Sequence, residues 1–278
     1  MYQAVHFTLS PHTGEYIGML SALLDMCDFD GIYEDEERIS AYMKADISLD
    51  AILREIEPIM ADAGCRLVSK IEDIPEQNWN RIWENSYEPV IIGSNCVIRA
   101  PFHPEYQNLK YQIIIEPKMS FGTGHHQTTK LMIEEIIKMD IEGKCILDMG
   151  CGTGILGILA AMMKASKIIA MDIDKQACEN TVENARRNGI SQISVRKGGV
   201  EKLSKESFDV VFANINQNIL REQIRTYSAV LHPGGILMIS GILLADEDQM
   251  LKFASAHGFR WLKSTELEGW IAMKFIRN

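Results

Sequence analysis

Three glycines and one carboxylate have the spacing of a ligand-binding loop. Asp148 is followed at every second position by Gly150, Gly152 and Gly154, directly after a short apolar run. Glycine is needed where the backbone approaches a ligand closely or takes a positive φ. The helical pattern over residues 155–164 would begin with N–H groups that have no partner inside the helix. The segment therefore predicts a buried strand, a loop and a helix that bind a nucleotide-like cofactor.

The polar residues around the loop bear on which cofactor it holds. Residues 152–157 also satisfy the GxGxxG dinucleotide pattern, which leaves NAD open on the loop alone. Asp148 can serve the cationic end of S-adenosyl-L-methionine, directly or through water, but would repel a pyrophosphate. Asp172 ends the next predicted strand, where a carboxylate can bind both ribose hydroxyls, a feature that NAD enzymes share. Asn214 ends a later strand, where an amide can hold an acceptor amine, so we predict S-adenosyl-L-methionine.

The elements that must position these residues alternate between strands and helices. This alternation predicts an α/β fold with a parallel, doubly wound sheet, whose ligand lies beyond the carboxyl ends of the strands. A late antiparallel pair is expected at one edge. The predicted strands are 97–100, 112–115, 145–149, 167–172, 192–196, 208–213, 235–240, 258–264 and 270–276. One predicted helix ends near residue 138, and the others span 155–164, 174–188, 217–230 and 246–256.

The beginning of the chain predicts a separate small domain. Its pattern has the order βαββαβ of a ferredoxin-like α+β fold, in which both helices cover one face of the sheet and leave the other open. The predicted strands are 3–9, 31–36, 38–43 and 65–71, and the predicted helices are 14–27 and 49–63. We predict this domain at 1–74, a linker helix at 75–88 and the larger domain at 89–278.

The net charge of −10 is confined to one part of the chain. Residues 1–75 hold 15 Asp and Glu against 5 Lys and Arg, whereas residues 76–278 hold 23 of each kind. An acidic domain repels nucleic-acid phosphates and attracts basic partners, although the same charge also serves solubility. We therefore expect the first domain to bind a basic protein, and we expect no direct nucleic-acid contact.

Composition bears on the compartment and on metal binding. No run of about 18 apolar residues predicts a membrane span, and the N-terminus lacks the pattern of a secretory signal. The six cysteines show neither CxxC spacing nor another metal-ligand pattern, so no metal site is predicted. A reduced, cytoplasmic, monomeric protein is the simplest expectation.

Together these motifs resemble the PrmA family, the methyltransferases of large-subunit ribosomal protein eleven. The resemblance runs from about Asn78 to the C-terminus and includes a signature upstream of the glycine loop. The matching segments are Phe121-Gly122-Thr123-Gly124 with His126 and Thr128-Thr129, Asp148 to Gly154, Asp172-Ile173-Asp174, Ala213-Asn214-Ile215 and Ser240-Gly241-Ile242-Leu243.

The resemblance implies a fold, a reaction and a set of contacts. It implies a Rossmann-like class I methyltransferase domain that methylates the N-terminal α-amine and lysine ε-amines of that basic ribosomal protein. The acidic N-terminal domain fits the family's substrate-recognition domain. The resemblance also implies that Thr129, Gly150, Asp172 and Asn214 contact the cofactor. Our full set of candidate cofactor-binding residues is Phe121, His126, Thr129, Asp148, Gly150, Gly152, Gly154, Asp172, Ile173 and Asn214.

Methyl transfer from a sulfonium needs a neutral, aligned amine more than it needs an acid or a base. The side-chain oxygen of Asn214 and the backbone oxygen of Ile215 could accept the amine's hydrogens and aim its lone pair, so we take both as catalytic. Asn214 could instead be a turn residue that ends a strand. His126 could line the methionine pocket, remove a proton or be structural. Phe121 could shield the methyl group or only pack.

The chain departs from the family pattern beside the expected acceptor site. His125 and Gln127 stand where the family usually has threonine and proline, and residues 216–218 replace a more apolar run. These polar groups bear on substrate preference more than on the reaction. Thr128 and Thr129 could cap the helix that follows them.

Two other functions are compatible with such a loop. A nucleic-acid base methyltransferase also uses an asparagine at this strand end, but usually in an Asn-Pro-Pro-aromatic motif. Residues 215–217 offer neither proline nor an aromatic ring, and residues 76–278 carry no net positive charge. A non-catalytic module that binds S-adenosylmethionine is disfavoured because Asp148, Asp172 and Asn214 are all present. The sequence therefore favours a protein N-methyltransferase.

Overall fold

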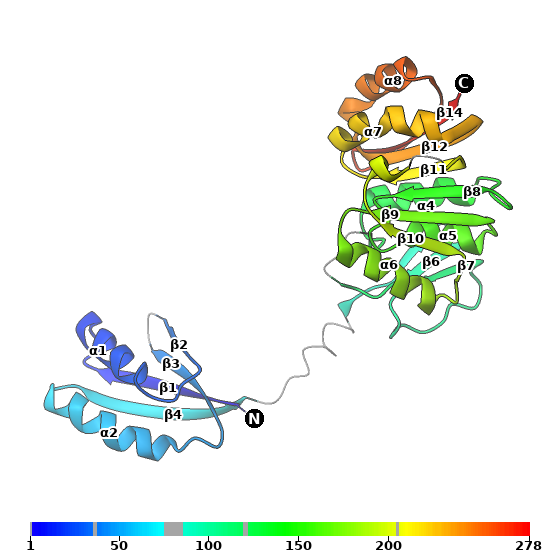
Figure 1. The fold of residues 1–278 in the computed structure, drawn as a ribbon. Coiled ribbons are helices and arrows are strands. Elements are labelled where there is room, and N and C mark those ends of the chain that lie inside the picture. Colours follow the sequence, from blue (N-terminus) through cyan, green and yellow to red (C-terminus); the bar gives the residue numbers. More distant parts are fainter. Residues whose placement is uncertain (1, 36–37, 75–85, 119–121, 204–205) are drawn as a thin grey trace. The chain divides into compact units, whose positions relative to one another are not determined.

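The computed structural model describes residues 2–35, 38–74, 86–118, 122–203 and 206–278 (Figure 1). The chain divides into two compact units, Met1–Ser86 and Tyr87–Asn278. Nearly all of the predicted linker helix, with Trp79 and Trp83, lies outside the described residues, so the linker and the domain boundaries stay predictions. Within the described ranges, no helix is both long and apolar enough to cross a membrane.

The first unit is an antiparallel sheet with two helices. The sheet has the strand order β2-β3-β1-β4, which is the ferredoxin-like arrangement that the sequence predicted. The elements in chain order are β1 (Tyr2–Ser10), α1 (Gly14–Leu24), β2 (Gly31–Glu34), β3 (Ile39–Lys44), α2 (Leu49–Asp62) and β4 (Arg66–Ile74).

Both helices pack on one face of this sheet. Val5, Phe7 and Ala41 point from the strands into a core that Leu20 of α1 and Met60 of α2 complete. Side chains alternate between the two faces of a strand, so the residues between these core positions lie on the opposite face. That face carries exposed Tyr2, Tyr33, Tyr42 and Val68.

The second unit is built on a seven-stranded sheet. Its order is β10-β9-β8-β11-β12-β14-β13, and all its pairings are parallel except those of β14 with β12 and β13. The strands are β8 (Cys145–Met149), β9 (Lys167–Asp172), β10 (Ile193–Lys197), β11 (Phe208–Asn214), β12 (Leu231–Leu243), β13 (Phe259–Leu267) and β14 (Trp270–Arg277). The order reverses between β8 and β11, so a ligand crevice is expected outside the carboxyl ends of these two strands.

Helices cover both faces of the large sheet, which confirms the doubly wound α/β prediction (Figure 1). One face packs on α4 (Gln127–Ile137), α5 (Ile155–Met162) and α6 (Lys175–Arg187), and the other packs on α7 (Gln217–Val230) and α8 (Glu247–Ala256). Short 3₁₀ turns, η1 (Val200–Lys202) and η2 (Leu244–Asp246), follow β10 and β12.

A second, three-stranded sheet leads the chain to the expected site. It has the order β5-β6-β7 and packs on α4 and α5. Its strands are β5 (Val90–Ile92), β6 (Cys96–Arg99) and β7 (Tyr111–Ile114). The sequence predicted β6 and β7 within one residue, but β5 was missed because three residues show too little alternation to be recognised.

Candidate functional site

The glycine loop joins β8 to α5 and has left-handed backbone at each of its glycines. The φ angles of Gly150, Gly152 and Gly154 are 70°, 54° and 79°. The carbonyl of Met171 accepts a hydrogen bond from Gly150 N at 2.8 Å, which ties the loop to the neighbouring strand β9. A Cβ on Gly150 would lie 2.2 Å from Cγ2 of Ile215, so the absence of a side chain lets the end of β11 reach the loop.

Asp148 is buried behind this loop. Its Oδ2 accepts a hydrogen bond from the Gly157 N–H at 2.9 Å, which holds the first turn of α5 against β8. Burial raises the pKa of Asp148 to about 7; the Gly157 N–H opposes this shift, and the Asp172 carboxylate adds to it. The structure thus shows a loop-holding role for Asp148, while its contact with the cofactor stays a prediction.

Asp172 lies at the end of β9 beside the same loop. Its Oδ2 accepts from Gly152 N at 3.0 Å, and its Oδ1 accepts from Asp174 N at 3.0 Å. The next residue, Ile173, is 72% exposed although it is apolar. This arrangement is compatible with a carboxylate that binds ribose hydroxyls and an apolar side chain that meets a base.

Asn214 ends β11 on the face of the sheet that α4 covers. Its Nδ2 donates to Oγ1 of Thr129 at 3.4 Å, and Thr129 is buried in the first turn of α4. Thr129 thus engages the amide nitrogen, and the amide oxygen Oδ1 is the atom of Asn214 that could accept from a ligand. The structure brings together two residues that lie 85 positions apart in the sequence.

Ile215 is held between two glycines. Its side chain packs on Gly150, and its carbonyl oxygen lies so close to Gly241 that a Cβ there would be 2.2 Å away. Gly241 has a φ of 88° and lies where the pairing of β12 with β14 shifts register. Gly241 belonged to a matched motif but had no predicted role, because its contact with Ile215 appears only in the fold.

The start of α4 differs from the expectation. Its N-cap is His126, not Thr128 or Thr129, so the predicted threonine caps are wrong. His126 Nδ1 accepts from Thr128 N at 3.3 Å and also lies 2.8 Å from Thr128 Oγ1. The His126 ring also meets the Trp270 ring with a centroid distance of 5.0 Å. The structure thus gives His126 a capping role at the start of α4.

Two other residues near the start of α4, His125 and Gln127, have hydrogen-bond partners within the chain. His125 contacts the carbonyl of Glu88 through Nε2 at 3.2 Å. Gln127 donates through Nε2 to Oε2 of Glu268 at 2.6 Å. Phe121 is outside the described residues, so its predicted role stays a prediction.

A buried hydrogen-bond network joins the glycine loop between β8 and α5 to the segment that follows β7. The sequence did not predict this network. Thr153 Oγ1 donates to the carbonyl of Gly122 at 2.6 Å, and Asn184 Nδ2 donates to the carbonyl of Thr153 at 3.0 Å. Asn184 Oδ1 accepts from Glu116 N at 3.0 Å, and Asn188 Oδ1 accepts from Ile114 N at 2.8 Å. These asparagines fix the segment after β7 to α6.

One signal could have revealed that network. Asn180, Asn184 and Asn188 recur at every fourth position of the predicted helix 174–188. A polar stripe at this spacing lies on one helix face, and amides on a face that packs inward need partners.

The residues at the carboxyl edge fit S-adenosylmethionine. Left-handed glycines allow close approach to the backbone, Asp172 ends β9 as a ribose-binding carboxylate would, and Asn214 presents an amide oxygen at the end of β11. In the described ranges, no three His, Cys, Asp or Glu side chains are grouped to hold a metal ion.

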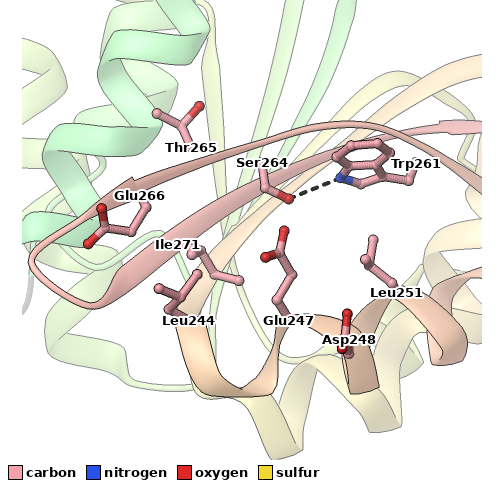
Figure 2. A pocket seen from close by; sticks show the side chains of 9 residues that line it. All are labelled: Leu244, Glu247, Asp248, Leu251, Trp261, Ser264, Thr265, Glu266 and Ile271. Atoms are coloured by element: carbon pink, nitrogen blue, oxygen red, sulfur yellow. Dashed lines mark hydrogen bonds between the residues drawn. The ribbon is translucent and has the colours of Figure 1, made fainter.

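A groove of about 420 Å³ lies elsewhere in the same unit, between α8 and β13 (Figure 2). It is lined by Leu244, Glu247, Asp248, Leu251, Trp261, Ser264, Thr265, Glu266 and Ile271. None of these residues belongs to the glycine loop or to the end of β11, so the groove is not the predicted cofactor site.

Comparison with known proteins gives one family. Residues 22–278 match the family described as "Ribosomal protein L11 methyltransferase (PrmA)". Proteins with that name are 36% identical in Phocaeicola vulgatus, over 99% of each chain, and 37% identical in Porphyromonas gingivalis, over 92% of this chain and 89% of the relative. The crystal structure of a ribosomal protein L11 methylase from Lactobacillus delbrueckii subsp. bulgaricus is similar with a TM-score of 0.64 and 26% identity, over 69% of this chain and 100% of that one.

Proposed function

The chain belongs to the ribosomal protein L11 methyltransferase (PrmA) family and is an S-adenosylmethionine-dependent protein methyltransferase, and we propose that it methylates lysine side chains and the N-terminal amine of ribosomal protein L11. The contact between the glycine loop and the end of β11 carries this proposal. Ile215 packs on Gly150, so the Asn214 and Ile215 oxygens that would accept from an amine lie beside the loop that would hold the cofactor.

The cofactor would be held by residues at the carboxyl edge of β8, β9 and β11. Asp172 would bind the ribose hydroxyls, Ile173 would meet the adenine, and the three loop glycines would let the backbone approach the methionine part closely. S-adenosylmethionine, when bound, would supply an electrophilic methyl group, whose carbon a neutral amine attacks while the bond to sulfur breaks and a neutral thioether leaves. The protein must therefore align the amine more than it must supply an acid or a base.

The acceptor amine must lose a proton before it reacts. A lysine ammonium has a pKa of about 10.4, so it arrives charged and releases its proton to solvent. Asn214 Oδ1 and the Ile215 carbonyl then each accept one N–H, which leaves the lone pair directed at the methyl group. Both acceptors are uncharged, so they do not raise the pKa of the amine as a carboxylate in their place would.

The first unit is proposed to recognise the protein substrate. Its open sheet face presents Tyr33 at 62% and Tyr42 at 37% exposure, together with Tyr2 and Val68. Tyrosine and apolar side chains of this kind are typical of protein interfaces. The excess of acids in residues 1–75 complements a basic partner. We further propose that the enzyme acts as a cytoplasmic monomer, which sedimentation at working concentration would check.

Mass spectrometry of ribosomal protein L11 tests the proposal. We expect mass increases of one or more methyl groups after incubation with the enzyme and S-adenosylmethionine, and fragment spectra should place them on amines. The matched control is the Asn214→Ala enzyme, which should bind the cofactor but leave L11 unmodified. Unmodified L11 after incubation with the wild-type enzyme would contradict the proposed substrate.

A further inference from the structure

The turn between β13 and β14 is a two-residue hairpin turn, because Leu267 pairs directly with Trp270. Glu268 has a φ of 50° and Gly269 a φ of 79°, so two consecutive residues are left-handed. Glycine adopts this conformation readily, but a long side chain such as glutamate does so uncommonly. A two-residue turn between antiparallel strands commonly has a positive φ at both positions, so the hairpin itself accounts for the conformation of Glu268.

The turn is held from two directions at the carboxyl edge of the sheet. Glu268 Oε2 accepts from Gln127 Nε2 at 2.6 Å, next to the N-cap of α4. The carbonyl of Gly269 accepts from Leu244 N at 2.9 Å, just beyond the end of β12. Gln127 is one of the departures from the family pattern, and this bond gives it a partner within the chain.

The turn lies on the same side of the sheet as Asn214. In the ladder, Ser240 of β12 pairs with Asn214 on one side and with Ala272 on the other. Directly paired residues share a face, as do residues two apart on a strand, so Trp270 lies on the Asn214 face. α4 bridges the two, because Thr129 bonds Asn214 and His126 contacts Trp270.

The side chains of the turn suit a cation. The Glu268 residue is exposed, and the Trp270 indole is half-buried. Neither Glu268 nor nearby Glu266 takes part in an ion pair among the described residues. Glu266 pairs with Ile271 and therefore lies on the α8 face of the sheet, where it and Glu247 line the groove of Figure 2, so these two carboxylates are not on the Asn214 face.

We propose that Glu268 and Trp270 form a subsite that binds the acceptor as an alkylammonium before it loses its proton at Asn214. The inference rests on the proposed function, because it concerns the acceptor of that reaction. The carboxylate attracts the charged amine, and the indole attracts the same cation through its ring face. The neutral oxygens of Asn214 and Ile215 then hold the amine after deprotonation, so capture and reaction use different groups.

Steady-state kinetics with ribosomal protein L11 test the subsite. Glu268→Gln removes the charge but keeps an oxygen for Gln127, and at low salt it should raise the KM for L11 about fivefold. Trp270→Leu should raise the same KM about fivefold. Trp270→Phe keeps an aromatic ring face, so its KM should be close to that of wild type. For all three variants, kcat and the Kd for S-adenosylmethionine should stay within about twofold of wild type, and about 0.5 M salt should shrink the Glu268→Gln effect.

Glu142→Gln is the matched control, since Glu142 precedes β8 at the opposite edge of the sheet and pairs with exposed Lys164. Its KM should equal that of wild type. If Glu268→Gln has the wild-type KM at low salt, or if it loses cofactor affinity instead, the subsite is wrong and the turn is only a structural support. If the wild-type enzyme does not modify L11 at all, the proposed function fails instead.

Discussion

Gly241→Ala should uncouple cofactor binding from methyl transfer. Gly241 has a φ of 88°, and a Cβ on it would lie 2.2 Å from the Ile215 carbonyl oxygen and 2.9 Å from its carbon. Real Cβ contacts essentially never fall below 3.0 Å, so the Ile215 carbonyl must move by about 0.8 Å. That oxygen is one of the two proposed to aim the amine.

The expected loss in the free energy of unfolding has two parts. A left-handed alanine costs about 1–2 kcal/mol wherever it occurs, and crowding in a packed site adds about 1–3 kcal/mol. Gly143→Ala isolates the first part, because Gly143 has a φ of 75° and a Cβ added to it would meet nothing within 4 Å. We therefore expect Gly241→Ala to be less stable than Gly143→Ala by about 1–3 kcal/mol. A misplacement of about 1 Å can lower a rate about a hundredfold, so kcat should fall by that order.

Urea unfolding gives the stability difference, and transfer of labelled methyl groups to L11 gives kcat. Calorimetry with S-adenosylmethionine shows whether the cofactor site survives, and we expect a Kd close to that of Gly143→Ala. The reasoning is refuted if Gly241→Ala transfers methyl groups at the rate of Gly143→Ala, because the position of the Ile215 carbonyl would then not matter.

Three further changes test other parts of the site. Asn214→Ala should keep most cofactor affinity but lose about a hundredfold or more in kcat, since it removes one of the two acceptors. Asp148→Asn should flatten the pH dependence of stability. Burial raises the pKa of Asp148 from 3.8 to about 7, so its stabilising contribution is full below pH 3.8 and is lost as the pH rises through about 7. Glu34→Lys with Asp35→Lys should weaken L11 binding at low salt and leave the Kd for S-adenosylmethionine unchanged.

Each of these expectations has a clear counter-result. Full activity of Asn214→Ala would remove its catalytic role. Thermal unfolding of the cofactor-free protein should show a larger loss of stability from about pH 6 to about pH 8 in wild type than in Asp148→Asn, and equal slopes would mean that Asp148 ionises normally. Unchanged affinity of the double lysine variant for L11 at low salt would argue against recognition by the acidic unit.

Most of the large sheet could be predicted because its central strands are buried on both faces. The expected strands 145–149 and 167–172 agree with β8 and β9 at both ends. Residues 145–149 are apolar except for Asp148, and residues 168–171 are apolar throughout, a pattern that burial on both faces produces. The strand predicted at 235–240 was too short, since β12 spans Leu231–Leu243 and continues through Pro233, Gly234 and Gly241, residues that normally interrupt a strand.

The candidate site could be predicted only where chemistry and spacing coincide. Asp172 and Asn214 end strands of one parallel sheet, so the alternating pattern alone placed them at one edge. The contact of Trp270 with His126 could not be found this way, because it depends on the position of β14, an antiparallel strand between β12 and β13. The predicted threonine cap of α4 was wrong because a histidine ring nitrogen can accept from the helix N–H groups as a threonine oxygen does, and His126 holds that position.

The asparagine stripe on α6 has a consequence for the chemical ageing of the protein. Asn188 is followed by Gly189, a sequence prone to deamidation because the glycine nitrogen can attack the side-chain carbonyl with little hindrance. In the folded chain that carbonyl accepts from Ile114 N at 2.8 Å, and Gly189 N donates to Arg186 O at 3.0 Å, so both reacting groups are held apart from each other. Deamidation at this position therefore requires the corner between β7 and α6 to open. The rate at which Asn188 deamidates during storage would therefore measure how often this corner opens.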